Sequence, residues 1–159
     1  MPLTQSRTVL EDCKVALAEI RDGVSGREWR IRWVAAVALL RTVGYVLRKV
    51  DAATDPLLKS VIDAAWDQLS ATKPQPTIFW AFIEEERNNV LKEYRLSAGQ
   101  GTTVRPGTGP TLYEYAMSSG PYAGRDQRAV LQEAIDWWGS YLAAIEREYA
   151  ARIGTQPTT

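Results

Sequence analysis

Residues 78–96 read Ile-Phe-Trp-Ala-Phe-Ile-Glu-Glu-Glu-Arg-Asn-Asn-Val-Leu-Lys-Glu-Tyr-Arg-Leu. Apolar residues recur in this stretch at helical spacing, and the densest polar cluster of the chain, residues 84–89, lies near its middle. An ideal α-helix turns about 100° per residue, so five side chains fall within about 80° of one another: Trp80, Glu84, Arg87, Leu91 and Tyr94. Because an arginine and a glutamate share a face with apolar residues, this helix is predicted to carry more than a solvated polar stripe.

Four further helices are predicted around this one, because apolar residues repeat at intervals of three and four. Asp55 directly before Pro56 marks a helix start, and Gly154 is a stop signal. The predicted helices span about Ser6–Arg21, Gly26–Val50, Pro56–Ser70, Ile78–Leu96 and Arg125–Ile153. The predicted fold class is therefore all-α, a single-domain bundle of about five helices over residues 1–153, with a disordered tail at 154–159.

Glycine and proline are concentrated between residues 97 and 124. We expect an irregular loop there before the last helix, and a loop of this length is usually functional or mobile. Residues 102–105 and 111–115 could pair as a small hairpin around residues 106–110. The glycines do not form a nucleotide-binding fingerprint, because none follows the spacing of a phosphate-binding loop.

The second predicted helix carries a stripe of arginines. Four of them cluster within about 60° on the helical wheel: Arg27, Arg30, Arg41 and Arg48. In one interpretation their stems cover apolar surface at the helix flank while their charged heads lie in water. In the other, the stripe faces phosphate groups or the acidic stretch of residues 84–86.

Composition excludes several kinds of site. The chain has 159 residues with 19 basic and 19 acidic side chains and no histidine. Histidine-based metal sites and serine–histidine or cysteine–histidine nucleophile pairs are therefore excluded. The run Glu84-Glu85-Glu86 could suggest a di-metal centre, but such centres also use Glu-x-x-His pairs. We expect no metal and no cofactor, and any attraction to nucleic acid must come from a local patch.

The sequence also bears on the cellular compartment. Cys13 is the single cysteine, which is typical of a reducing environment. The longest uninterrupted apolar run, Val34–Leu40, is far shorter than the roughly 20 residues of a membrane-spanning helix. We therefore expect a cytoplasmic protein that does not associate with a membrane.

The residues from Arg87 to Tyr94 resemble the signature of the HEPN superfamily, in which an arginine and a polar residue precede a histidine by four to six residues. Arg87 and Asn88 match the first half of this motif, and the histidine is missing. Lys92 and Tyr94 stand five and seven residues after Arg87, near the place of the histidine. The resemblance implies a small helical bundle, often a homodimer, that acts on RNA in bacterial defence or toxin–antitoxin systems.

The resemblance also implies a chemistry: metal-independent RNA cleavage in which Arg87 stabilises the charged phosphorane. Tyr94, on the same face of an ideal helix, fits the proton-transfer role better than Lys92. Tyrosine and lysine have reference pKa values near 10 and 10.4, so the base form at pH 7 costs roughly 4 kcal/mol. We therefore expect a HEPN-like, RNA-associated module with a degenerate or absent ribonuclease site. Its candidate catalytic residues are Arg87, Tyr94 and Lys92, and its candidate RNA-binding residues are Asn88, Glu84, Arg30, Arg41 and Arg48.

Two alternatives remain open. In the first, Glu84 and Arg87 form an ion pair three residues apart that closes over the core, with Tyr94 packed beside them. In the second, the protein has no enzymatic activity and binds a protein partner through residues 97–124 and exposed aromatic side chains. Trp137 and Trp138 are adjacent, so one helix cannot point both inward, and one of them is expected to face a partner or the long loop.

Overall fold

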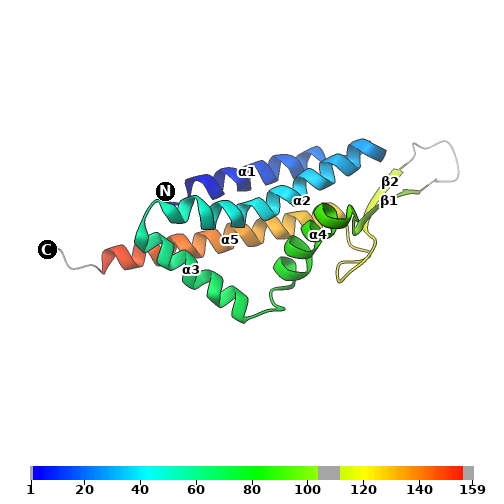
Figure 1. Ribbon diagram of the computed structural model, residues 1–159. Coiled ribbons are helices and arrows are strands. Elements are labelled where there is room, and N and C mark those ends of the chain that lie inside the picture. The colour runs from blue at the N-terminus through cyan, green and yellow to red at the C-terminus, as the bar shows by residue number, and fades with distance from the viewer. Residues whose placement is uncertain (1, 104–111, 156–159) are drawn as a thin grey trace.

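The computed structural model describes residues 2–103 and 112–155, and Figure 1 shows the arrangement of their helices and strands. The helices are α1 (Thr4–Glu19), α2 (Gly26–Lys49), the 3₁₀ turn η1 (Asp51–Ala53), α3 (Pro56–Ala71), η2 (Ile78–Glu84), α4 (Glu85–Asn88), η3 (Asn89–Glu93) and α5 (Gln127–Gly154). The strands are β1 (Ala98–Thr103) and β2 (Leu112–Met117). The prediction of an all-α bundle is confirmed. Of the predicted tail, Gly154 ends α5, and residues 156–159 lie outside the described part of the chain.

The long helices α1, α2 and α5 run side by side and form the main layer of the bundle (Figure 1). Their facing stripes make the core, in which Trp33 of α2 and Trp138 of α5 are almost completely buried. Burying a large apolar side chain contributes about 1.5–3 kcal/mol, so this layer supplies much of the folding free energy. None of the helices in the described ranges is long and apolar enough to cross a membrane.

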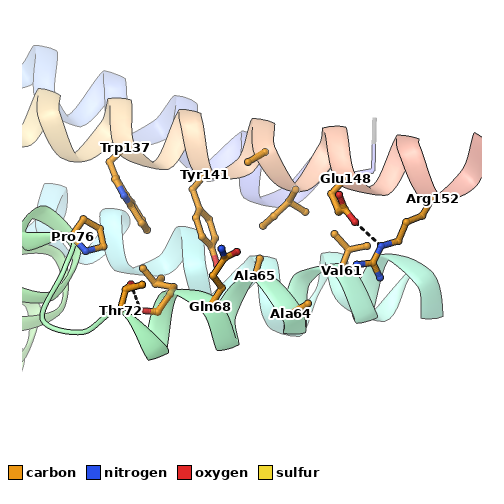
Figure 2. Close-up of a pocket in the computed structure, with 13 residues that line it drawn as sticks. Val61, Ala64, Ala65, Gln68, Thr72, Pro76, Trp137, Tyr141, Glu148 and Arg152 are labelled. Atoms are coloured by element: carbon orange, nitrogen blue, oxygen red, sulfur yellow. Dashed lines mark hydrogen bonds and ion pairs between the residues drawn. The ribbon is translucent and has the colours of Figure 1, made fainter.

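Helix α3 begins as predicted, with Asp55 accepting hydrogen bonds from the backbone N–H groups of Leu57 and Leu58 and with Pro56 at the first helical position. A groove of about 580 Å³ lies between α3 and α5. Figure 2 shows Trp137 and Tyr141 extending from α5 toward α3 in this groove. Their rings are stacked, with centroids 5.0 Å apart. Trp138 is buried, so Trp137 is the outward member of the pair, and it lines this groove.

Residues 78–96 do not form one regular α-helix, in contrast to the prediction. Seven residues of η2 and five of η3 are π-helical, with only the four residues of α4 between them. A π-helix is wound more widely than an α-helix, so positions seven residues apart no longer align. Helical structure ends at Glu93, and Tyr94 adopts the left-handed conformation with φ of 51°. The predicted common face of Arg87 and Tyr94 is therefore wrong.

Part of the segment at residues 97–124 forms an antiparallel β-hairpin, so the small hairpin suggested by the sequence is confirmed. The pairing runs from Ala98 opposite Met117 to Thr103 opposite Leu112. The first strand therefore begins earlier, and the second ends later, than the sequence indicated. Residues 104–111, where the predicted turn lies, are outside the described residues. Alternate side chains of β2, Tyr115 and Met117, are buried, and this burial gives the strand its inward face.

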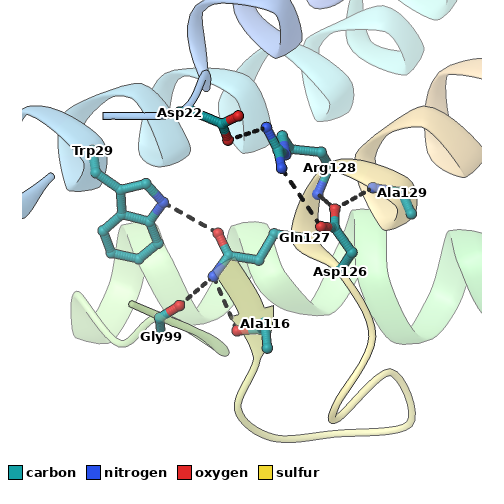
Figure 3. A network of polar contacts seen from close by, with 8 residues as sticks. All are labelled: Asp22, Trp29, Gly99, Ala116, Asp126, Gln127, Arg128 and Ala129. Carbon is teal, nitrogen blue, oxygen red and sulfur yellow. Dashed lines mark hydrogen bonds and ion pairs between the residues drawn. The ribbon is translucent and has the colours of Figure 1, made fainter. Parts of the chain in front are cut away.

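Gln127, the first residue of α5, fastens the hairpin to the helices (Figure 3). Its side chain is completely buried and accepts a hydrogen bond from Trp29 Nε1 at 3.1 Å. Its amide nitrogen donates to the carbonyl oxygen of Ala116 at 2.9 Å and to that of Gly99. One side chain thus links α2, α5 and both strands, and it holds the hairpin at the end of the bundle.

Candidate functional site

Glu86 anchors the short helix α4 against α2. It is 2% exposed, and its Oε1 accepts hydrogen bonds from Trp33 Nε1 at 3.0 Å and from the backbone N–H of Ser97 at 2.9 Å. The first bond joins α4 to the core tryptophan of α2, and the second sets the start of β1. Sequence reasoning missed this residue as a functional candidate, because a glutamate within three consecutive glutamates has no signal that distinguishes a buried one from its solvated neighbours.

Glu84 and Arg87 do not pair with each other, so the predicted ion pair between them is wrong. Glu84 Oε2 lies 2.7 Å from Arg41 Nε, and both side chains are largely shielded from solvent. The contact is an ion pair without a well-aligned hydrogen bond, because neither atom meets hydrogen-bond geometry. Arg87 Nη1 instead donates to the neighbouring Asn88 Oδ1 at 2.8 Å. The π-helical turn of η2 directs Glu84 toward α2 rather than along its own helix.

Tyr94 lies at the surface and contacts an arginine of α2. Tyr94 is 59% exposed, and the guanidinium carbon of Arg30 lies 6.0 Å from the centroid of its ring. Arg30 Nε is buried without a hydrogen-bond partner among the described residues. Lys92, the other candidate for the place of the histidine, is exposed on η3. Within residues 2–103 and 112–155, no hydrogen bond or ion pair joins Arg87 to Lys92 or to Tyr94.

Two other arginines of the α2 stripe also pair with aromatic rings. Arg41 lies over Tyr45, with 5.4 Å from its guanidinium carbon to the ring centroid, and Arg48 lies over Trp66 at 4.4 Å. On a regular helix Arg30, Arg41 and Arg48 fall within about 20° of one another and span about 27 Å. Arg41 contacts the acidic stretch through Glu84, as the second interpretation expected. The guanidinium heads of the three arginines, rather than their stems, lie over aromatic rings.

Two described side chains are poorly suited to proton transfer or nucleophilic attack near neutral pH. Burial, with a smaller effect from Asp12, raises the pKa of the Cys13 thiol to about 12, so this cysteine is not a nucleophile near neutral pH. Burial also raises the pKa of Tyr141 to about 12. In the part of the chain that the structure describes, no group of three or more histidine, cysteine or acidic side chains could hold a metal ion.

The site therefore combines three features: a buried glutamate that anchors α4, an arginine paired with asparagine, and an exposed tyrosine under an arginine. Such a surface can bind an anion and stack an aromatic ring. Comparisons with protein-family models, with curated proteins and with solved structures find no match to this chain. The fold and the site thus define a helical bundle with an appended β-hairpin and a surface of arginines and aromatic rings along α2.

Proposed function

We propose that this protein is a HEPN-like, RNA-associated module of a bacterial or phage defence or stress system, with a degenerate or absent ribonuclease site. The observation that carries the proposal is the pair formed by Arg30 and the exposed Tyr94. Tyr94 follows Arg87 and Asn88 closely in the sequence. An aromatic ring beside a guanidinium is a surface on which unpaired bases of RNA stack while the cation attracts the phosphate.

The charges on this surface support the proposal. Among the described residues, Arg30 and Arg87 form no ion pair with a carboxylate, so their positive charge is free to attract an anionic ligand. Arg48 likewise contacts an aromatic ring rather than an acid. Arg41 and Glu84 neutralise each other, so we assign them to stabilising the surface rather than to contacting RNA.

The same surface argues against efficient cleavage. The chain has no histidine, and Tyr94 has left the helix instead of extending along the face of Arg87. In the part of the chain that the structure describes, no hydrogen bond or ion pair holds Lys92 or Tyr94 beside Arg87. We therefore propose binding of RNA with little or no cleavage. We also propose a homodimer, since Leu91 is more than half exposed and can meet a second copy of the chain.

Fluorescence anisotropy with a labelled single-stranded RNA oligonucleotide tests the proposal. Replacing Tyr94 with alanine should weaken binding by about 5- to 150-fold, because stacking of one base contributes about 1–3 kcal/mol. Replacing Arg87 with alanine should weaken binding of all sequences and reduce the slope of log affinity against log salt by about one. The matched control is Arg152→Ala, which removes an arginine near the far end of α5 and should leave binding unchanged.

Failure of the wild-type protein to bind RNA would contradict the proposal, as would equal affinities of wild type and Tyr94→Ala. Either result would favour the second candidate function, a non-enzymatic module that binds a protein partner. That alternative is supported by the groove between α3 and α5, where the stacked Trp137 and Tyr141 form an aromatic wall. The sequence also suggested residues 97–124 for this role, and residues 98–103 and 112–117 of that segment form the hairpin.

A further inference from the structure

A second pocket, separate from the Arg30–Tyr94 surface, lies between the η2–α4 segment and the turn that follows β2. Its volume is about 390 Å³, at the lower end of the range for small-molecule sites. Polar groups from both sides line it, namely Glu85, Glu86, Asn89, Arg95, Ser119 and Tyr122. None of these residues belongs to the arginine stripe of α2, so the pocket is distinct from that surface.

The unusual feature of this pocket is the buried carboxylate of Glu86. Both hydrogen bonds to this side chain, from Trp33 and from Ser97, go to the same oxygen, Oε1. Oε2 accepts no hydrogen bond from any described residue, and no described cation forms an ion pair with Glu86. Oε2 is not among the fully buried atoms that lack a hydrogen-bond partner, so it reaches the solvent of the pocket, where a cation or a strong donor can approach it.

The other charged groups favour a positively charged ligand over an anion. Glu85 adds a second carboxylate at the exposed rim of the pocket. Arg95 also lines the pocket, but its Nη1 lies 3.2 Å from Glu93 Oε2, and this pair is well exposed to solvent. Phe82 and Tyr122, with ring centroids 6.0 Å apart, provide apolar surface beside the carboxylate. A carboxylate next to aromatic rings is an environment that favours binding of an alkylammonium group.

We propose that this pocket binds an alkylammonium group, whose nitrogen donates to Glu86 Oε2 while its carbon chain lies against Phe82 and Tyr122. Glu85 at the rim attracts the cation, and the hydroxyl oxygen of Ser119 and the amide oxygen of Asn89 can accept hydrogen bonds from its remaining N–H groups. The same chemistry is present in a free alkylamine and in a lysine side chain. The proposal does not depend on RNA binding, since neither Arg30 nor Tyr94 lines this pocket.

Isothermal titration of the full chain tests the proposal with three amines: butylamine, 1,4-diaminobutane and Nα-acetyl-lysine amide. 1-Butanol is the neutral control and should not bind. Glu86→Gln keeps an oxygen that can accept from Trp33 and Ser97 but places an amide N–H₂ at the free position. It should weaken amine binding at least about tenfold, because a charge-assisted hydrogen bond is lost. Glu85→Gln should weaken binding only a few-fold, and Glu148→Gln, on α5, should not change it.

A second variant keeps the test decisive if Glu86→Gln does not fold. Ser119→Trp fills the pocket from an exposed turn and leaves the hydrogen bonds of Glu86 in place, so it should abolish amine binding without loss of helical circular dichroism. Tighter binding of the diamine would identify a free amine as the ligand, and tighter binding of the lysine amide would identify a lysine side chain. No binding of any amine to the wild type would overturn the proposal. Undiminished binding to folded Glu86→Gln or Ser119→Trp would overturn it as well.

Discussion

At the scale of single residues, Gly44 shows how one missing side chain allows two helices to approach. Gly44 is buried in the middle of α2, where glycine costs about 1 kcal/mol relative to alanine in helix propensity. A Cβ atom built on Gly44 would lie 2.8 Å from Cη2 of Trp138, closer than real Cβ contacts allow. Trp138 is 1% exposed and has no room to move aside. Helix packing therefore outweighs helix propensity at this position.

We predict that Gly44→Ala destabilises the protein by about 1–2 kcal/mol, because overpacking a filled core costs typically 1–3 kcal/mol and the gain in propensity offsets only part of it. The control is Gly139→Ala in α5, where nothing lies within 4 Å of the added Cβ, and it should stabilise by about 0.5–1 kcal/mol. Urea unfolding followed by circular dichroism measures both. Equal midpoints for the two variants would refute this explanation.

Asp51 is another single residue whose role depends on tertiary contact. It is 2% exposed and its carboxylate accepts hydrogen bonds from the backbone N–H groups of Gln5 and Ser6 and from Ser6 Oγ. Asp51 thus caps the N-terminus of α1 from 45 residues away in the chain. Local sequence rules place a cap next to the helix that it caps, so they could not have identified this one.

At the scale of elements, α3 depends on its N-terminal cap. Asp55 accepts hydrogen bonds from the backbone N–H groups of Leu58 and Leu57. It also accepts one from Tyr149 Oη at 2.9 Å, so the start of α3 is joined to α5. The hydrogen bonds from Leu58 N–H and then from Tyr149 hold the pKa of Asp55 below its ordinary value. Each of these bonds favours the charged carboxylate in the folded state.

We predict a pH-dependent contribution of Asp55 to stability. Because its pKa is lowered on folding, the contribution is complete above the unfolded pKa of about 3.9 and is lost as the pH falls through the lower, folded value. Asp55→Asn should preserve the cap but remove this titration. Thermal unfolding between pH 2 and pH 7 should therefore show a smaller gap between wild type and variant at low pH. A gap that is constant with pH would contradict the prediction.

The segment at residues 78–96 shows why element boundaries in this chain were harder to predict than element types. Its apolar spacing correctly indicated a helix. Hydrophobic periodicity, however, cannot distinguish α-helical hydrogen bonding from π-helical hydrogen bonding, which reaches one residue further along the chain. The difference matters because it places Glu84 against Arg41 and leaves Tyr94 outside the helix. The residues that an ideal helical wheel placed on one face therefore belong to η2, to α4 and to the end of η3.

At the scale of the whole molecule, Gln127 joins the hairpin to the helices. We predict that Gln127→Leu destabilises the protein by about 2–4 kcal/mol, because Trp29 Nε1 and two backbone carbonyl groups lose their partners. Hydrogen exchange should become faster in β1 and β2 than in α1 and α2. Gln132→Leu is the control, since that exposed side chain donates only to Asp136. Unchanged exchange in the strands would show that the hairpin is held by other contacts.

The sequence by itself determined the fold class and the approximate helix ranges, because apolar periodicity and local caps such as Asp55-Pro56 depend on neighbours in the chain. It also excluded histidine chemistry, since that conclusion depends on composition alone. Only the tertiary structure decided that Glu86 is buried while Glu85 is exposed, that Arg41 pairs with Glu84, and that Tyr94 lies beneath Arg30. The physical reason is that burial and ion pairing depend on which surfaces distant segments present to one another, and a one-dimensional pattern does not contain that information.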